Sequence, residues 1–204
     1  MTSRRRVASG LALTCFALAG ASGALEAQAT APTAEVPVLL TSCGQSPGPE
    51  RVKFFLNRLN LEHEFLAQAT AEDLVTRQRS GHAVKTLIVV TGASLKGMGA
   101  AGVSMPQELA RTAALIEEAR RQGIKLIGAH VEGMARRAQG AAPGDNSDEL
   151  SIDAVMPISD FMIVRKDGDE DRRFTVISEN RKIPLILFEK NMEMGDVLTR
   201  VFGG

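Results

Sequence analysis

Tryptophan and tyrosine are absent from this chain of 204 residues, which carries only 8 phenylalanines. Exported sugar-binding proteins usually stack their ligand on aromatic rings, and proteins that bind single-stranded nucleic acid stack bases on them. Acidic and basic residues balance at 24 each, so no basic excess is available to hold nucleic acid or an anionic membrane surface. These absences disfavour carbohydrate and nucleic-acid partners. They leave open a small, charged, non-aromatic ligand.

Cysteine is almost as scarce, and the first of the two, Cys15, lies in an unusual amino-terminal segment. This segment has a basic start at 4–6, a small and apolar stretch at 7–25, and a small-x-small triplet at 27–29. These are the three parts of a secretory signal. We therefore predict a signal peptide over residues 1–29, exported by the general secretory route or, as an alternative, by the twin-arginine route.

The expected mature chain keeps a single cysteine. Cleavage after Ala29 removes one cysteine, three arginines and one glutamate, so Cys43 remains alone and the net charge becomes slightly negative. A lone cysteine excludes an intramolecular disulfide, so the fold has to rest on its hydrophobic core. No later apolar run approaches the ~20 residues of a membrane span. The sequence predicts a periplasmic or secreted protein without stable membrane insertion.

A short polar tether at 30–35 precedes alternating strand-like and helix-like segments, which we assign to one α/β domain at 36–204. Continuous apolar strands separated by amphipathic helices are typical of a parallel sheet covered on both faces. We predict a doubly wound, Rossmann-like three-layer sandwich with a mainly parallel sheet of about six strands. The first choice of strand order is 3-2-1-4-5-6 and the second is the flavodoxin-like order. The predicted strands are 36–40, 65–69, 86–90, 124–129, 161–164 and 185–188, and the predicted helices are 49–61, 71–80, 106–122, 148–156, 172–181 and 191–202.

Polar residues follow the first and third of these strands. In a doubly wound sheet, ligands bind beyond the carboxyl ends of the strands, where helix-start amides and glycine-rich turns favour anions. The turn at 41–49 and the glycine-rich segment at 92–104, interpreted as a loop, meet this description. Their candidate ligand-binding residues are Ser42, Gln45, Ser46, Ser94, Lys96 and Gly97.

A third polar segment follows the fourth strand. His130 ends that strand, and the pair Arg136 and Arg137 suits bidentate recognition of a carboxylate. The segment 132–148 is rich in Gly, Ala and Pro and is interpreted as a long mobile loop that could act as a lid. Three acidic residues at its end, Asp145, Asp148 and Glu149, are expected to be solvated.

Two enzymatic alternatives stay open. Cys43, at the start of a helix, could act as a nucleophile with His130 as its base, which would make a hydrolase or transferase. The literal G-x-G-x-x-G at 97–102 suggests a dinucleotide-dependent oxidoreductase, but it stands about six residues beyond its strand. The three histidines show no metal-ligand spacing, so we expect neither a metal nor a cofactor.

The motifs also carry a family likeness. The segments 41–47 (TSCGQSP), 85–90 (KTLIVV), 94–102 (SLKGMGAAG) and 128–130 (GAH), with the following arginine pair, resemble an uncharacterised family of bacterial exported α/β domains classed as a domain of unknown function. The resemblance runs from about Val38 to the carboxyl terminus. It implies the fold and export but no established activity, so it supplies no catalytic residue.

The sequence as a whole favours an exported, non-enzymatic domain that binds a small carboxylate or another small anion. The expected partner is that anion, with a membrane transporter or sensor as a further possibility. The hydrolase or transferase with Cys43 and His130 is the alternative, and the oxidoreductase is third.

Overall fold

The computed structural model of the protein describes residues 31–140 and 146–203. The predicted signal peptide, Cys15, the first residue of the tether, and residues 141–145 of the predicted lid lie outside the described residues. None of the described helices is long and apolar enough to cross a membrane.

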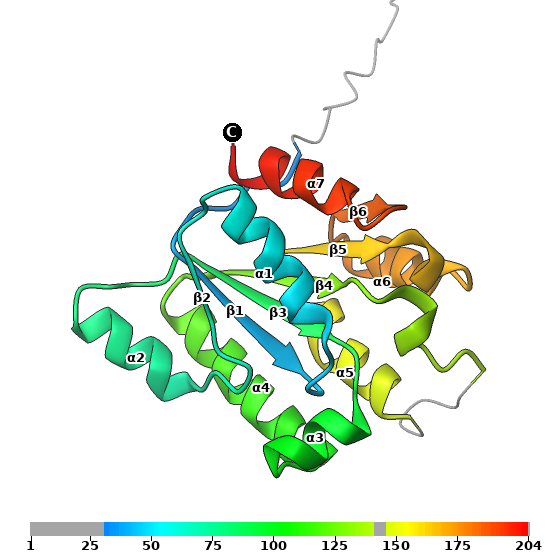
Figure 1. The fold of residues 1–204 in the computed structure, drawn as a ribbon, viewed down its shortest axis with the longest axis horizontal. Coiled ribbons are helices and arrows are strands. Elements are labelled where there is room, and N and C mark those ends of the chain that lie inside the picture. The colour runs from blue at the N-terminus through cyan, green and yellow to red at the C-terminus, as the bar shows by residue number, and fades with distance from the viewer. Residues whose placement is uncertain (1–30, 141–145, 204) are drawn as a thin grey trace, which may run out of the picture. The chain divides into compact units, whose positions relative to one another are not determined.

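Six parallel strands form one sheet in the order β2-β1-β3-β4-β5-β6 (Figure 1). The predicted doubly wound α/β architecture is therefore confirmed. The strands are β1 (Val38–Cys43), β2 (His63–Phe65), β3 (Thr86–Thr91), β4 (Lys125–His130), β5 (Phe161–Arg165) and β6 (Leu185–Phe188). The α-helices are α1 (Gly48–Arg58), α2 (Ala71–Arg79), α3 (Leu95–Ala101), α4 (Met105–Arg121), α5 (Ser147–Val155), α6 (Arg173–Arg181) and α7 (Glu193–Phe202), and short 3-10 turns are η1 (Gly133–Arg136), η2 (Met156–Ile158) and η3 (Lys166–Asp169).

The first-choice strand order, 3-2-1-4-5-6, is wrong, and the flavodoxin-like order is the correct one. The physical reason lies in β2 and β3. All six residues of β3 are buried, whereas β2 is a three-residue strand that is only half-buried. The rejected order would place the short polar strand inside the sheet and the apolar one at its edge. Pairing β3 between β1 and β4 buries it on both sides instead.

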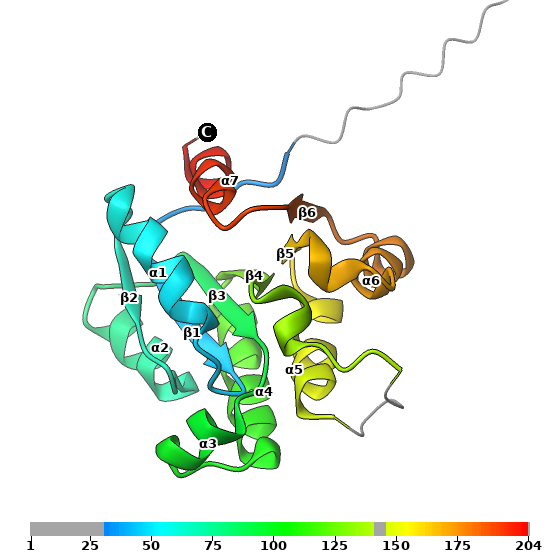
Figure 2. The ribbon, with the colours of Figure 1, turned by 45° about the vertical axis from the view of Figure 1, so that its right-hand side comes forward.

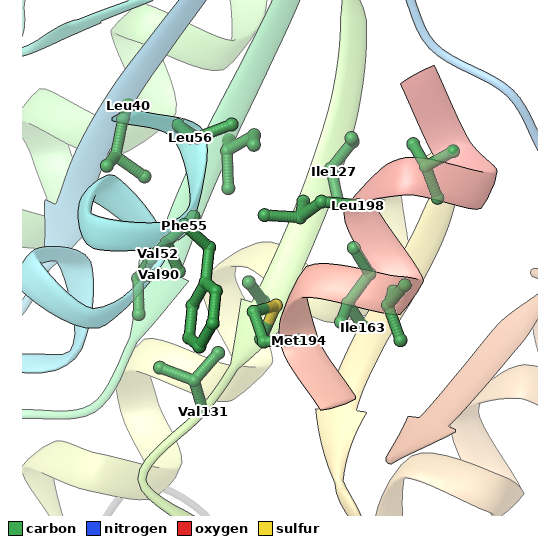
Figure 3. Packing of buried hydrophobic residues seen from close by; sticks show 14 of the residues in the cluster. Leu40, Val52, Phe55, Leu56, Val90, Ile127, Val131, Ile163, Met194 and Leu198 are labelled. Carbon is green, nitrogen blue, oxygen red and sulfur yellow. The ribbon is translucent and has the colours of Figure 1, made fainter. Parts of the chain in front are cut away.

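The helices divide unequally between the two faces of the sheet. α1 and α7 cover one face and pack against residues such as Leu40, Ile127 and Ile163 (Figure 3). α2, α4 and α5 cover the opposite face, and α6 joins α5 over β5. The view in Figure 2 shows α1 and α7 on the same side of the sheet. α1 and α7 therefore share one face of the sheet.

The glycine-rich segment after β3 is a helix, so its interpretation as a loop is wrong. Ser94 is the N-cap of α3, and its hydroxyl accepts a hydrogen bond from Gly97 N at 3.0 Å. Gly102 ends the helix in the left-handed conformation. A side-chain cap and a C-terminal glycine are enough to define a short helix despite its internal glycines.

Smaller differences concern boundaries. β1 extends three residues beyond its predicted end because Thr41, Ser42 and Cys43 pair with β3 up to Thr91. β2 begins two residues before its predicted start and ends four residues before its predicted end, and the predicted lid contains η1 and the start of α5. The predicted helices after β1, β3 and β4 are otherwise found within a few residues of their expected bounds.

Candidate functional site

The crevice between the β1 and β3 loops, where a doubly wound sheet usually binds its ligand, is closed by the protein itself. Gln45 and Ala93 form an isolated β-bridge across it, and Ser94 N donates to Gly44 O at 2.8 Å. A Cβ atom on Gly44 would lie 2.7 Å from Ala93 Cα, and one on Gly97 would lie 2.1 Å from Gln45 O. The glycines therefore serve close contact between two loops, because only a residue without Cβ fits there.

A buried ion pair fills one flank of this crevice. Glu108 of α4 is fully buried, and its carboxylate accepts from Arg111 Nε at 3.0 Å, Gly44 N at 3.0 Å and Gln45 Nε2 at 2.9 Å. Burial alone would raise the pKa of Glu108, but these hydrogen bonds and the charge of Arg111 bring it below its ordinary value. Arg111 also donates to Ser42 O and Ala69 O. Glu108 thereby holds the predicted ligand residue Gln45.

A second buried carboxylate closes the other flank. Glu132, 4% exposed, accepts from Gly48 N at 3.1 Å at the start of α1, and its Oε1 lies 3.5 Å from Arg136 Nε. Arg136 donates from Nη1 to Ala93 O at 2.9 Å. The Ser46 hydroxyl accepts from Gly48 N at 3.3 Å. The donors expected for an external anion thus serve this carboxylate and neighbouring loops.

The predicted ligand residues converge only in part. Gly92 brings Ser46 and Arg136 together, since a Cβ there would lie 3.0 Å from Arg136 Cβ and 3.4 Å from Ser46 Oγ. Lys96 lies exposed in the first turn of α3. Ser42 is buried in β1, and its hydroxyl has no hydrogen-bond partner among the described residues.

His130 is a fully buried structural histidine. Its Nε2 lies 3.1 Å from Gly133 O and its Nδ1 3.1 Å from Thr91 Oγ1. Because a carbonyl oxygen only accepts, the neutral ring donates from Nε2, and its Nδ1 faces the Thr91 hydroxyl, which also lies 3.3 Å from Ala129 O. Burial lowers the pKa of His130 to about 4, and Arg137 adds to this, while Gly133 O and nearby carboxylates oppose it. Both ring nitrogens are thus committed to the protein.

The structure does not bring Cys43 and His130 together. Cys43 pairs with Thr91 across β1 and β3, and Thr91 in turn contacts His130 on the next strand. The threonine therefore stands between the two residues, which are separated by about two strand spacings of ~4.8 Å. Burial raises the pKa of the Cys43 thiol to about 11. A thiol without an adjacent base is a poor nucleophile.

Arg137 is also committed to internal contacts. Its side chain is 1% exposed and pairs with Glu149 at 2.8 Å and with Asp171 at 2.6 Å, and its guanidinium lies over the ring of Phe174. The expectation that Asp148 and Glu149 are solvated is wrong. Glu149 is buried, and Asp148 accepts from Ala93 N at 2.6 Å. Desolvation raises the pKa of Asp148, although this bond opposes the shift.

The G-x-G-x-x-G at 97–102 does not form a phosphate-binding turn. Its first two glycines lie inside α3 and its last caps that helix. A dinucleotide fingerprint would instead open a helix directly after the strand. Among the described residues, no group of three or more His, Cys, Asp or Glu side chains is placed to hold a metal ion.

An open cavity lies elsewhere on the same carboxyl edge, between α1 and α7. It has a volume of about 480 Å³ and is lined by Glu50, Arg51, Phe54, Phe55, Val131, Phe188, Asn191, Met192 and Met194. These residues come from α1, which follows β1, from Val131 directly after β4, and from the end of β6 and the start of α7. Figure 3 shows Phe55, Val131 and Met194 pointing toward one another between the two helices.

Most of the lining is apolar, and Arg51 is its single cation. Phe54 is 56% exposed and Met192 61% exposed, so the rim presents apolar surface to solvent. The exposed Arg51 makes one hydrogen bond among the described residues, a long one of 3.5 Å from Nη1 to Val131 O. Glu50, the acid of the lining, is instead paired with Lys53 at 3.3 Å. Arg51 therefore keeps most of its donors available.

Sequence reasoning missed this cavity. The periodic apolar face of the first predicted helix includes Phe55, but Arg51 and Phe54 lie beside that face. A phenylalanine next to the buried stripe of a surface helix is the signal that could have directed attention there.

The sequence of this chain matches the model of a known protein family. The chain belongs to the family described as Domain of unknown function (DUF6305), whose model matches residues 35–202. The resemblance drawn from the sequence motifs to an uncharacterised family is thereby confirmed. No curated protein matches the chain.

The solved structures to which the chain is similar resemble it only distantly. A GDSL-like lipase from Bacteroides thetaiotaomicron has 14% identity and a TM-score of 0.32, over 74% of this chain and 66% of that one, which is less than two thirds of its length. A UDP-N-acetylglucosamine 4-epimerase from Bacillus cereus has 11% identity and a TM-score of 0.42, over 83% and 86%. A psychrotrophic esterase from Pseudoalteromonas sp. has 8% identity and a TM-score of 0.31, over 80% and 92%. Similarities of this size carry no conclusion about chemistry.

Proposed function

We propose that this protein is an exported, non-catalytic binding module for a small amphipathic carboxylate, and that the ligand occupies the cavity between α1 and α7. The observation that carries the proposal is the placement of Arg51, an exposed cation with available donors, beside an apolar cavity. The small-anion function expected from the sequence is kept, and its site is moved from the closed crevice to this cavity.

The size and composition of the cavity support a ligand with an apolar body. A volume of about 480 Å³ lies within the range of roughly 300–1,000 Å³ that is usual for small-molecule sites. Six apolar side chains, Phe54, Phe55, Val131, Phe188, Met192 and Met194, line it. Burying the apolar part of a ligand against them is favourable by ~0.8 kcal/mol for each methylene group.

The charge of the lining supports a carboxylate as the polar end of the ligand. The planar guanidinium of an arginine matches a carboxylate in a bidentate geometry. Arg51 supplies this group at the edge of the cavity, while the nearby Glu50 is paired with Lys53. A neutral ligand of the same shape would gain the apolar contacts but lack the charge-assisted hydrogen bonds.

The chemistry of the remaining residues supports binding rather than turnover. The nucleophile and base of the hydrolase or transferase alternative, Cys43 and His130, are buried and separated by Thr91. Neither is among the residues that line the cavity.

Isothermal titration calorimetry with octanoate and with its neutral analogue octanamide tests the proposal. The wild-type protein is expected to bind octanoate about tenfold more tightly than octanamide, as one exposed charge-assisted hydrogen bond contributes ~1.5 kcal/mol. Arg51→Gln should remove this preference and leave the octanamide affinity unchanged. Arg79→Gln, which changes an exposed arginine of α2, is the matched control and should have no effect.

Two results would contradict the proposal. One is the absence of octanoate binding by the wild-type protein. The other is an equal affinity for octanoate and octanamide in the wild type, which would show that no cation of the protein binds the carboxylate.

Export is the second part of the proposal, and it rests on the basic, apolar and small-residue segments at the amino terminus. The intact mass of the protein recovered from the periplasm is expected to correspond to a chain that begins at Thr30. A full-length mass, or recovery from the cytoplasm alone, would contradict export through this signal.

A further inference from the structure

The cavity beside Arg51 continues into a second hollow along the same two helices. This hollow has a volume of about 290 Å³ and is lined by Phe55, Arg58, Leu59, Met192, Gly195, Asp196 and Thr199. It shares two side chains, Phe55 and Met192, with the first cavity. The two spaces therefore adjoin at these side chains, and residues of both α1 and α7 line each of them.

Phe55 and Met192 form the boundary between the two spaces, and Phe55 is the rigid residue of this pair. Its side chain is 5% exposed and packs into the core beneath α1 and α7. The ring of Phe54 meets it edge-on, with ring centroids 5.0 Å apart. Met192 is the adaptable part, because it is 61% exposed and an unbranched thioether side chain readily changes shape.

A glycine on α7 lies directly against this boundary. A Cβ atom on Gly195 would lie 3.3 Å from Phe55 Cδ1 and 3.6 Å from Cε1. Glycine is unfavourable within a helix, but at this position it leaves space for the aromatic ring. A side chain at this position would therefore press on the ring of Phe55, which would have to shift by a few tenths of an ångström.

We infer that Phe55, held against Gly195, is the residue that sets the length of the ligand, and that the ligand is an alkyl carboxylate. This inference rests on the proposed function. With its carboxylate at Arg51, an unbranched chain extends through the first cavity until it meets the Phe55 ring. A longer chain has to displace that ring to enter the second hollow.

The inference predicts a break in the relation between chain length and affinity. Within the first cavity each added methylene should increase affinity about fourfold, which corresponds to ~0.8 kcal/mol. Beyond the length at which the chain reaches Phe55, further methylenes should add less than twofold each.

Calorimetric titration of hexanoate, octanoate, decanoate and dodecanoate, each below its micellar concentration, locates this break. Phe55→Leu shortens the boundary side chain and should move the break to a longer acid. Gly195→Ala pushes the ring toward the first cavity and should move the break to a shorter acid. Alanine is also favoured over glycine in a helix, so this variant keeps the test valid if Phe55→Leu does not fold. Gly99→Ala, at a helical glycine with nothing within 4 Å of the new Cβ, is the matched control and should leave the series unchanged.

The outcomes separate the inference from the proposed function. If the wild type binds the acids but the break stays at the same length in both variants, Phe55 is not the length-determining residue and the inference is overturned. If the wild type binds none of the acids, the proposed function is overturned, and the inference falls with it.

Discussion

Two regions on the same carboxyl edge of the sheet differ in how their polar groups are used. In the crevice between the β1 and β3 loops, the carboxylates of Glu108 and Glu132 are buried, and backbone amides and arginines of the protein are among their hydrogen-bond and ion-pair partners. In the cavity between α1 and α7, Arg51 is exposed and makes one long hydrogen bond among the described residues. The crevice carries more polar residues, most of which are paired with one another, whereas the cavity carries an exposed cation that keeps most of its donors available.

The difference teaches that polar residues at a strand end are not by themselves a binding site. A buried donor or acceptor without a partner costs about 1–3 kcal/mol, so a fold that closes its loops tends to satisfy them internally. An unused donor beside an unfilled apolar space is the better indication of a ligand. The predictions below test whether the crevice is closed and the cavity open.

The largest expected effect is on stability, from removing one partner of the buried ion pair in the crevice. Glu108→Gln leaves Arg111 without its carboxylate and should lower the free energy of unfolding by about 3 kcal/mol. Urea denaturation measures this. Glu117→Gln, an exposed glutamate on the same helix, is the matched control and should change stability little. A variant as stable as the wild type would mean that this ion pair does not hold the crevice closed.

The thiol at the base of the crevice should be protected by the closed loops. Because burial raises the pKa of Cys43 to about 11, its thiolate fraction at pH 8 is roughly a hundredfold lower than that of an unfolded thiol. Reaction with a disulfide reagent, in the Cys15→Ser chain so that Cys43 is the only thiol, should be slower than in urea by at least this factor. Equal rates would show that the crevice opens readily.

His130 predicts a pH dependence of stability. Its pKa is about 4 in the folded protein and ~6.5 in the unfolded chain, so between these values the unfolded chain binds more protons. The stabilisation from neutral His130 is therefore complete above pH 6.5 and is lost as the pH falls toward 4. The free energy of unfolding should be about 2 kcal/mol lower at pH 5 than at pH 7.5.

Two measurements check this assignment. NMR titration of the native protein should place the pKa of the His130 ring near 4, and the pH dependence should persist in His82→Asn, which changes an exposed histidine. A pKa near 6.5 for the His130 ring would contradict its burial and its contacts with Thr91 and Gly133.

The smallest expected effect separates the two regions as ligand sites. Lys96→Ala should change octanoate affinity by less than twofold, because Lys96 is exposed on α3 and is not among the residues that line the α1–α7 cavity. A loss of tenfold or more, comparable to that expected for Arg51→Gln, would instead place the anion at the crevice, as the sequence suggests.

Much of the fold could be predicted from the sequence, because its signals are local. The apolar run in β3 and the spacing of Val52, Phe55 and Leu56 in α1 are patterns within single elements. The strand order was harder, since it depends on which strands can tolerate an edge. The half-buried residues of β2 provide that answer once their pairing is seen.

The candidate site could be predicted only in its location at the carboxyl edge. Sequence proximity suggested that Lys96 and its neighbouring glycines form an anion-binding loop, but Ser94 caps a helix there and Gly97 packs against Gln45 O. No local pattern indicates that Glu108 reaches the β1 loop across 64 residues of sequence.

The amino-acid sequence alone determined the alternation of strands and helices and hence a parallel sheet with polar residues at one edge, because these follow from periodic burial along the chain. Only the tertiary structure decided which of those polar residues are satisfied by one another and which remain free. That outcome depends on distances between loops that are far apart in sequence. The space between α1 and α7 has the same origin, since residues far apart in the sequence line it.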